Sequence, residues 1–237
     1  MKYLYIWDDI EVFCAKKLCE KIESEFGEFL PYLNDIENTE FTLIKNKSFK
    51  NWASKFKNMD MDTVITIGTR PRTIFFKKDT LIKNIKLKRI ISKDGETKKV
   101  EFLNGSKKTL LDCIKNQNEI HFFEDVIVSG KTISSICDFL VKNNYSGKVV
   151  FHVFIANYEA VSKMGGKYKN ISFEINKFMQ GTPIKNSTLL CLYDLIFGKL
   201  GDKYYKERTD LLELFFNNRI GELKSFIKKF DNKVGVE

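Results

Sequence analysis

The stretch from Ile120 to Thr132 constrains the fold of this chain more than any other. It begins with a short, mostly apolar run, passes into two adjacent carboxylates and ends in a turn of small residues. Beyond this turn the apolar residues recur at helical spacing, at Ile133, Ile136, Cys137, Leu140 and Val141. The order strand, loop, helix is typical of parallel α/β proteins, which bind anionic ligands where the carboxyl end of a strand meets a helix N-terminus.

The turn has the composition of a phosphate site. Ser129, Gly130, Lys131 and Thr132 lie where the first N–H groups of a helix have no partner within that helix. Gly130 allows a positive φ and a close approach of the backbone to a ligand. Ser129 and Thr132 add hydroxyl donors, and the helix dipole favours a dianion. We therefore expect a phosphate group at this turn.

Glu124 and Asp125 lie just before this turn. Carboxylates repel phosphate, so we expect this pair to bind sugar hydroxyls, a metal ion, or both. A ligand that carries a phosphate at one end and a vicinal diol in the middle satisfies both groups. Ribose 5-phosphate is such a ligand.

Two other interpretations of the stretch stand beside this one. The Gly-Lys-Thr sequence suggests a nucleoside-triphosphate loop, but that motif requires a glycine where this chain has Asp125. An acid in the middle of a triphosphate cradle is electrostatically unfavourable. The second alternative is a buried strand that enters a helix through an acidic turn and binds nothing.

The run 120–132 resembles the signature by which type I phosphoribosyltransferases bind 5-phosphoribosyl pyrophosphate (PRPP), in a version close to that of purine-salvage members. The resemblance implies a Rossmann-like parallel sheet with helices on both faces. It implies that Glu124 and Asp125 hold the ribose 2- and 3-hydroxyls and that residues Val128 to Thr132 wrap the 5-phosphate. The implied activity is Mg²⁺-dependent transfer of the phosphoribosyl group to a nitrogenous base, with release of pyrophosphate.

One position departs from the family pattern. Hypoxanthine-guanine-type members have an aspartate general base before the pair of small residues, and this chain has Val128 there. Valine cannot transfer a proton, so a general base must come from elsewhere. A purine-type acceptor is slightly favoured. The alternative is a non-catalytic regulatory protein that binds PRPP or a nucleotide on the same fold.

A second loop follows the apolar stretch 62–67. Gly68 permits close backbone approach, Thr69 supplies a hydroxyl and Arg70 supplies a fork of donors, a combination that suits pyrophosphate. In the phosphoribosyltransferase layout, a pyrophosphate loop follows the first core strand at this place. The alternative is a plain turn before a helix begun by Pro71, with Arg70 solvated.

Residues 85–103 predict a hairpin, with strands over 85–91 and 100–103 and an Asp-Gly turn between them. In the resembled family, a mobile arm in this interval closes over the active site during catalysis. A plain surface hairpin is the alternative. If the hairpin is the mobile arm, three of its lysines would neutralise the departing pyrophosphate: Lys93, Lys98 and Lys99.

We expect a core at residues 59–185 with an extension at each end. The N-terminal segment 1–58 opens with a strand at 3–7, after which Asp8 and Asp9 cap a helix that stops at Gly27. A metal site is the other interpretation of these two acids. The C-terminal segment, residues 186–237, reads as helical over 189–197, 211–216 and 220–230. Three roles are open for these helices: a hood over the site, formed together with the N-terminal segment, a homodimer surface, or simple core.

Within the core, the pattern after residue 132 predicts a strand over 148–156, a helix over 158–164 and a strand over 171–175. His121 and His152 fall within strands and are flanked by apolar residues. Since neither has an Asp or Cys constellation beside it in the sequence, we interpret both as core or edge histidines.

Composition limits the partners and the location. The chain has 237 residues, of which 43% are hydrophobic, so one continuous body can bury a full core. No apolar run approaches the roughly 20 residues that span a bilayer. The start shows no signal peptide, and the five cysteines suit reduced thiols of a cytoplasmic protein. The net charge of +9 favours anionic partners, but no basic recognition helix or RNA motif supports nucleic acid.

Overall fold

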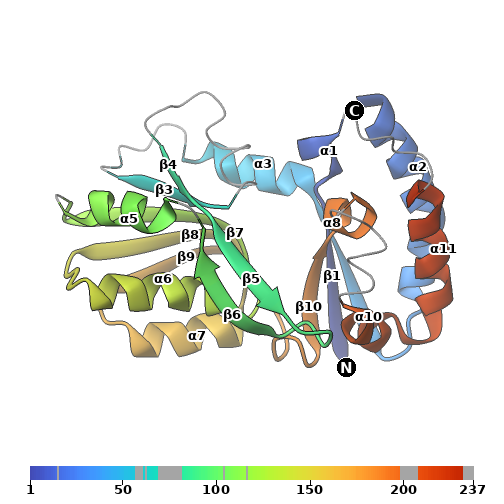
Figure 1. The fold of residues 1–237 in the computed structure, drawn as a ribbon. Coiled ribbons are helices and arrows are strands. Elements are labelled where there is room, and N and C mark those ends of the chain that lie inside the picture. Colours follow the sequence, from blue (N-terminus) through green and yellow to red (C-terminus); the bar gives the residue numbers. More distant parts are fainter. Residues whose placement is uncertain are drawn as a thin grey trace. The chain divides into compact units, whose positions relative to one another are not determined.

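The computed structural model describes residues 1–14, 16–56, 61, 63–68, 82–103, 105–115, 117–197 and 208–231. The chain divides into two compact units (Figure 1). Unit 1 comprises Met1–Ser48, Ile91–Glu96 and Ile184–Glu237, and unit 2 comprises Phe49–Ile90 and Thr97–Pro183. Each unit contains its own parallel sheet.

The sheet of unit 2 has five strands in the order β4-β3-β7-β8-β9, and every neighbouring pair is parallel. Helices cover the inner strands, and β8 is buried at every position after Lys148, which suits its mostly apolar sequence. This arrangement confirms the expected parallel α/β fold. The strands are β3 (Val64–Ile67), β4 (Lys83–Ile85), β7 (Glu119–Ile127), β8 (Lys148–Asn157) and β9 (Ile171–Met179).

Helices lie on both faces of this sheet. On one face, Phe122 and Phe151 belong to a buried cluster shared with three helices. On the other face, helix α3 (Asn46–Ser54) brings Phe49 against Phe154, with ring centroids 4.9 Å apart, and Trp52 lies 5.6 Å from the same ring. The helices of the first face are α5 (Ser106–Ile114), α6 (Lys131–Lys142) and α7 (Tyr158–Lys167).

The expected hairpin is confirmed as a two-stranded sheet of β5 (Leu87–Ile91) and β6 (Thr97–Phe102), which we call the ribbon. The Ser106 hydroxyl holds its base: it accepts a hydrogen bond from the Lys86 N–H at 2.9 Å and donates to the Lys86 carbonyl at 3.1 Å. The ribbon strands pair with each other and not with the strands of the five-stranded sheet, among the described residues.

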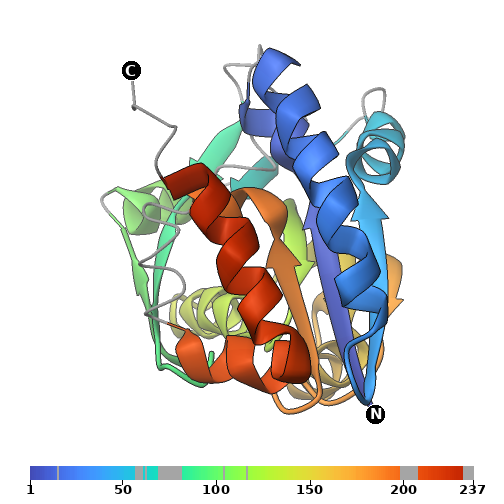
Figure 2. The same ribbon diagram turned by 90° about the vertical axis from the view of Figure 1, so that its right-hand side faces the viewer.

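Unit 1 has a three-stranded parallel sheet in the order β10-β1-β2, built from β1 (Lys2–Asp8), β2 (Thr39–Lys45) and β10 (Ser187–Cys191). Two long helices, α2 (Lys16–Asn34) and α11 (Ile220–Asp231), run side by side in this unit (Figure 2). Their facing rings Phe29 and Phe226 stack with centroids 4.7 Å apart. The remaining helical elements are α1 (Ile10–Phe13), α8 (Leu192–Phe197), α10 (Thr209–Phe216) and the 3₁₀ turn Asn217–Arg219.

The predicted helix over 189–197 is wrong in its first half. Residues Ser187–Cys191 form β10, where Leu189 pairs with Tyr5 and Leu190 with Ile6, and a helix follows only from Leu192. A strand buried on both sides is a continuous apolar run, which periodicity cannot distinguish from a buried helix.

The predicted helix stop at Gly27 is also wrong, because α2 continues through Gly27 and Pro31 to Asn34. The side chains of Ile22, Phe26, Phe29 and Leu33 are buried at helical spacing on both sides of the glycine. Burial of these residues outweighs the roughly 1 kcal/mol that an interior glycine costs. Helix α7 likewise runs through Gly165 and Gly166 to Lys167.

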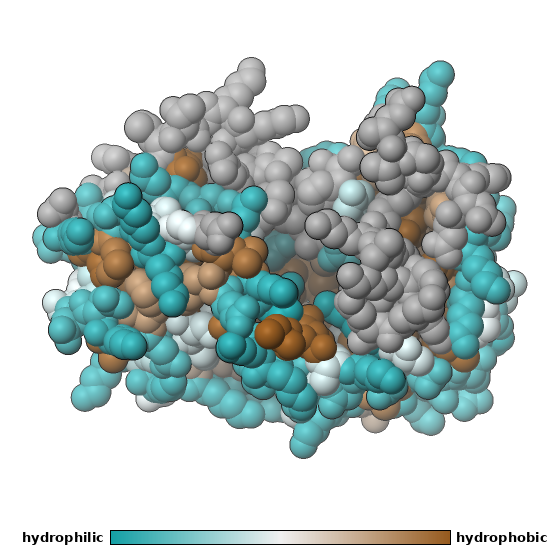
Figure 3. Space-filling view, in the orientation of Figure 1, coloured by the Kyte–Doolittle hydropathy of each residue, from teal (hydrophilic) through white to brown (hydrophobic). Residues whose placement is uncertain are grey.

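Hydrophilic residues cover most of the face seen in Figure 3, where the hydrophobic residues appear as separate patches. Among the described residues, none of the helices combines the length and the apolar character that a membrane span requires.

Candidate functional site

The acid pair lies inside strand β7, near its carboxyl end, whereas the sequence suggested that the strand stopped before it. Glu124 pairs in register with Val153 of β8, and the ladder continues to Ile127. Glu124 is 8% exposed and Asp125 is half-buried. The two carboxyl groups interact, because both a hydrogen bond and the charge of Asp125 act on the side chain of Glu124.

The loop Val128–Gly130 joins β7 directly to α6. Gly130 adopts φ +72°, and a Cβ at this position would lie 3.0 Å from the Cε and Sδ atoms of Met164. The residue before α6 is this glycine, which has no side chain that could cap the helix. The first N–H groups of α6 are therefore available to a ligand, and Ser129 and Thr132, both half-buried, lie beside them. The structure thus brings the acid pair and the loop together on one segment.

Burial raises the pKa of Glu124 well above its ordinary value, and the negative charge of Asp125 raises it further. The positive charge of Arg89, on strand β5, acts in the opposite direction. The Asp125 Oδ1 atom accepts a hydrogen bond from the Val126 N–H at 2.8 Å. A buried carboxyl group of this kind is costly for a fold and is typical of functional sites.

Lys131 is the first residue of α6, and its side chain extends to the ribbon. Its Nζ atom donates a hydrogen bond to the Thr97 carbonyl at 2.6 Å. The backbone N–H of Lys131 lies at the N-terminus of α6, while its ammonium group is engaged with strand β6. No sequence pattern indicated this partner, which lies 34 positions away.

Thr69 and Arg70, the residues predicted to bind pyrophosphate, lie outside the described residues. Gly68, just before them, adopts φ +79°, and its N–H donates to the Ile85 carbonyl at 2.8 Å. Strands β3 and β7 are parallel neighbours, so the loops that follow them leave the same edge of the sheet. The pyrophosphate role of Thr69 and Arg70 stays a prediction.

Two aromatic residues at the same edge were missed by the sequence analysis. Tyr158 is 63% exposed and Phe178 is 46% exposed, with ring centroids 5.6 Å apart. Phe178 pairs in register with Ala156, which pairs with Ile127 at the end of β7. The predicted last strand ended at 175, so Phe178 was not assigned to any element. An exposed pair of rings at this edge of the sheet offers a surface for a planar ligand.

The loop that follows β9 is fixed beside these rings. Asn157, which is fully buried, donates from Nδ2 to the Gly181 carbonyl at 2.7 Å and accepts from the Ala160 N–H at 3.2 Å. The Thr182 hydroxyl donates to Glu159 Oε1 at 2.9 Å. The segment 180–183 is therefore held against the start of α7.

The two histidines do have a constellation, which corrects the sequence interpretation in part. His121 Nδ1 lies 2.9 Å from His152 Nε2, and His152 Nδ1 lies 2.8 Å from Glu174 Oε2. His152 is 1% exposed, and burial lowers its pKa. These contacts join strands β7, β8 and β9, and the core role holds for His152.

The described residues include no cluster of three or more His, Cys, Asp or Glu side chains that would hold a metal ion. The site does offer the carboxylate oxygens of Asp125 and Glu124, which are the donor type that Mg²⁺ prefers. Mg²⁺ commonly binds through substrate phosphates and one or two carboxylates rather than an all-protein cage. The donor set therefore fits a magnesium ion that arrives with a phosphorylated substrate.

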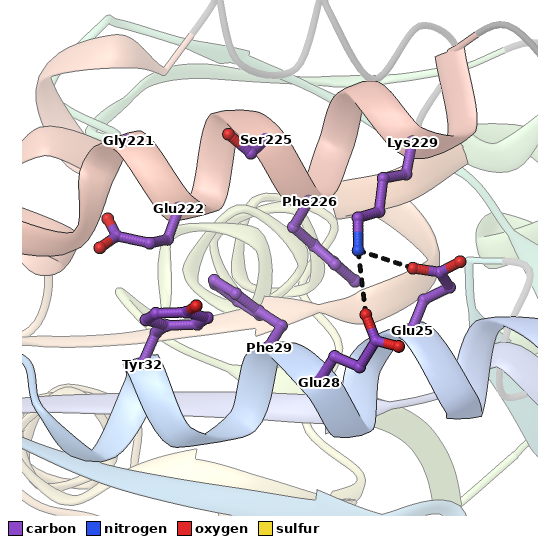
Figure 4. A pocket seen from close by; sticks show the side chains of 9 residues that line it. All are labelled: Glu25, Glu28, Phe29, Tyr32, Gly221, Glu222, Ser225, Phe226 and Lys229. Carbon is purple, nitrogen blue, oxygen red and sulfur yellow. Dashed lines mark hydrogen bonds and ion pairs between the residues drawn. The ribbon is translucent and has the colours of Figure 1, made fainter.

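A cavity of about 500 Å³ lies between α2 and α11 in unit 1 (Figure 4). Lys229 Nζ lies 2.8 Å from Glu25 Oε2 and 3.2 Å from Glu28 Oε2, so ion pairs neutralise much of its rim. The rings of Phe29 and Phe226 stack within it. The cavity shares no residue with the β7–α6 segment, which remains the candidate site.

No protein-family model and no curated protein sequence matches this chain. Solved structures do. A hypothetical protein from Neisseria gonorrhoeae with bound ppGpp is 15% identical, with 69% of this chain and 90% of that chain covered and a TM-score of 0.42. An adenine phosphoribosyltransferase from Trypanosoma brucei, in complex with AMP, pyrophosphate and ribose 5-phosphate, is 11% identical, with coverages of 60% and 67% and a TM-score of 0.39.

An orotate phosphoribosyltransferase from Aeropyrum pernix is 12% identical, with 70% of this chain and 78% of that chain covered and a TM-score of 0.33. Phosphoribosyltransferases, the family whose signature the 120–132 stretch resembles, are thus among the structures to which the chain is similar. At these TM-scores and identities, function has to be argued from the residues of this chain.

Proposed function

We propose that this protein binds PRPP at the β7–α6 segment and transfers the 5-phosphoribosyl group to a nitrogenous base, releasing pyrophosphate. One observation carries the proposal: a buried Glu124 and a half-buried Asp125 lie shortly before a helix N-terminus whose preceding residue, Gly130, has no side chain to cap it. The acid pair suits hydroxyls and developing positive charge, and the helix N-terminus suits a phosphate dianion. A ribose 5-phosphate satisfies both at once.

The residues divide the substrate between them. The N–H groups from Gly130 to Thr132 and the hydroxyls of Ser129 and Thr132 hold the 5-phosphate, while Val128 lines the loop. Glu124 and Asp125 accept hydrogen bonds from the ribose hydroxyls. Because positive charge builds at C1 as the pyrophosphate leaves, carboxylates near the sugar also stabilise the transition state.

The leaving pyrophosphate needs cations. Arg70 takes this role in the proposal, together with lysines of the ribbon and Arg89, whose charge already acts on Glu124, while Thr69 supplies a hydroxyl donor. Magnesium, bound with the substrate, would neutralise part of the phosphate charge. The five cysteines are free thiols, in keeping with a cytoplasmic enzyme.

The acceptor contacts the rings of Tyr158 and Phe178 in this proposal. Two exposed aromatic rings at the carboxyl edge suit a flat heterocycle, and the fixed segment 180–183 would border it. A purine-type acceptor is favoured by the form of the PRPP signature. Val128 is not a proton acceptor, so the acceptor's general base is not taken from that position.

A second function is favoured by one observation. The residue at position 128 is valine, where hypoxanthine-guanine-type members of the resembled family have their general base. A protein that retains the residues for binding ribose and phosphate but lacks this base would bind PRPP without turnover. Such a protein would respond to the concentration of PRPP. This regulator would use the same acid pair and the same loop.

Calorimetric titration of PRPP with Mg²⁺ tests the site. We expect saturable binding to the wild type and a loss of at least about 100-fold in affinity in the Glu124→Ala/Asp125→Ala double variant, since charged hydrogen bonds contribute about 1.5–3 kcal/mol each. Asp112→Ala, which removes an exposed acid from α5 of the same unit, is the matched control and should bind as the wild type does. Absence of binding to the wild type would overturn the proposal.

Pyrophosphate release then separates the enzyme from the regulator. Incubation with PRPP and a panel of purine and pyrimidine bases should release pyrophosphate with at least one base. The Tyr158→Ala/Phe178→Ala variant should retain PRPP affinity and lose most of this release. Tight PRPP binding without release in any mixture would favour the regulatory function.

A further inference from the structure

Lys131 links two parts of unit 2 that are distant in sequence. Its backbone N–H begins helix α6 at the anion loop, but its ammonium donates to the carbonyl oxygen of Thr97 at 2.6 Å. Thr97 is the first residue of β6 and is only 6% exposed. The side chain of an anion-loop residue therefore holds the ribbon.

The contact lies at the far end of β6 from the points that fix the base of the ribbon. At the base, Ser106 bonds to both backbone groups of Lys86, and Phe102 lies against Phe139 of α6 with ring centroids 5.2 Å apart. The contact of Lys131 is at the opposite end of β6, where the strand begins. Loss of this hydrogen bond would thus loosen the beginning of β6 before its base.

The ammonium group of Lys131 has a stronger partner available to it once an anion binds. An anion attracts the ammonium through its charge as well as through a hydrogen bond, whereas the Thr97 carbonyl carries no net charge. The lysine side chain has a flexible four-carbon stem and three donors, so it can turn from one acceptor to another. Its backbone is already at the place where the anion would sit.

We infer that Lys131 is a ligand-sensitive latch. Without an anion it holds Thr97 and so fixes the ribbon, and an anion at the N-terminus of α6 takes the ammonium and releases the beginning of β6. The inference rests on the proposed function, to which it adds a regulation of the same site. Because Arg89 belongs to the same ribbon, the release also changes the positive charge that acts on Glu124.

Hydrogen–deuterium exchange of the β6 amides tests the latch, with ribose 5-phosphate and inorganic phosphate as probes. In the wild type, saturating ribose 5-phosphate should raise the exchange of residues 97–99 roughly fivefold, the factor that corresponds to one lost hydrogen bond of about 1 kcal/mol. Lys131→Met should show the raised exchange without ligand and no further rise. Lys142→Met, in the exposed last turn of the same helix, should behave as the wild type does.

Calorimetry on the same samples distinguishes the possible failures. If ribose 5-phosphate binds but β6 exchange stays constant or slows, the latch is overturned and the proposed function stands. If Lys131→Met leaves β6 exchange at the wild-type level, the latch is overturned whatever binds. If neither probe binds to the wild type, the anion site fails, and both the proposed function and the latch fail with it.

Discussion

Two parallel strands of this chain carry a pair of adjacent acids near their carboxyl ends, and the two pairs have different surroundings. Asp8 and Asp9 close β1 in unit 1, and Glu124 and Asp125 lie near the end of β7 in unit 2. Asp9 is fully buried and Glu124 nearly so. Burial raises the pKa of Asp8 in the first pair and of Glu124 in the second. The two acid pairs therefore resemble each other in their place at the end of a strand, in their burial and in the direction of the pKa shift.

The difference lies in the use of a helix N-terminus. Asp9 Oδ1 accepts a hydrogen bond from the N–H of Tyr193, the second residue of α8, at 2.8 Å. In unit 1 the acid itself therefore satisfies a helix amide. In unit 2 the residue before α6 is Gly130, which has no side chain to cap the helix, and Asp125 accepts a hydrogen bond from the Val126 N–H of its own strand. An acid pair therefore indicates a ligand site only when the hydrogen-bond partners of the neighbouring helix amides are known.

The largest expected effect comes from removal of the Asp9 carboxylate. Asp9→Ala leaves the Tyr193 N–H without this acceptor inside the protein, and we expect the free energy of unfolding to fall by about 2–3 kcal/mol. Asp9→Asn keeps an oxygen acceptor of the same shape and should retain most of the stability. Chemical denaturation measures both.

The contrast between the two acid pairs would be wrong if Asp9 bound a ligand. Neither Asp9 variant should change the affinity for ribose 5-phosphate beyond twofold, since the acid already has a structural partner. A loss of affinity in Asp9→Ala without a loss of stability would mean that the first pair is also a ligand site.

The glycine loop gives the next effect. Gly130→Ala forces a side chain into the left-handed region, at a cost of about 1–2 kcal/mol, and brings its Cβ within 3.0 Å of the end of Met164. Gly105 is the matched control, because it also precedes a helix at positive φ but has open space around a Cβ. Thermal unfolding should show a larger loss for Gly130→Ala, and only this variant should weaken phosphate binding. Equal losses would mean that the contact with Met164 is unimportant.

The smallest effect concerns the charge of Glu124. Its pKa is raised in the folded protein, so ionisation costs stability at a pH above the folded value, and this cost is absent below the ordinary pKa of 4.5. Glu124→Gln, which carries no charge at any pH, should therefore stabilise the unliganded protein at pH 7. The gain should shrink as the pH falls toward 4.5, while ribose 5-phosphate affinity is lost at every pH.

Glu101→Gln serves as the control for this titration. Its hydrogen bond to Lys99 lowers the pKa of Glu101, so the substitution should bring no gain in stability at pH 7. Denaturation curves at a series of pH values compare the two variants. A Glu124→Gln protein less stable than the wild type at pH 7 would show that the carboxylate is well compensated in the fold.

The parts that the sequence predicted well are local. The strand, the loop and helix α6 are continuous in sequence, and their apolar spacing and glycine determine them. The parts that it missed depend on distant partners. The strand identity of Ser187–Cys191 is set by β1, and the amide that Asp9 caps lies 184 positions away. The contact of Lys131 with the ribbon and the effect of the Arg89 charge on the pKa of Glu124 also depend on the tertiary structure, so no local sequence pattern predicts them.

The place of β10 has a consequence for the order in which the protein is made. Strand β1 lies in the middle of its sheet, between β2 and β10. A ribosome synthesises β1 and β2 first and then the whole of unit 2, and only afterwards residues 187–191. Until then one edge of β1 carries backbone groups without their native partner, which is the kind of edge that pairs with other chains. The nascent chain must protect its first strand while the whole of unit 2 is being translated.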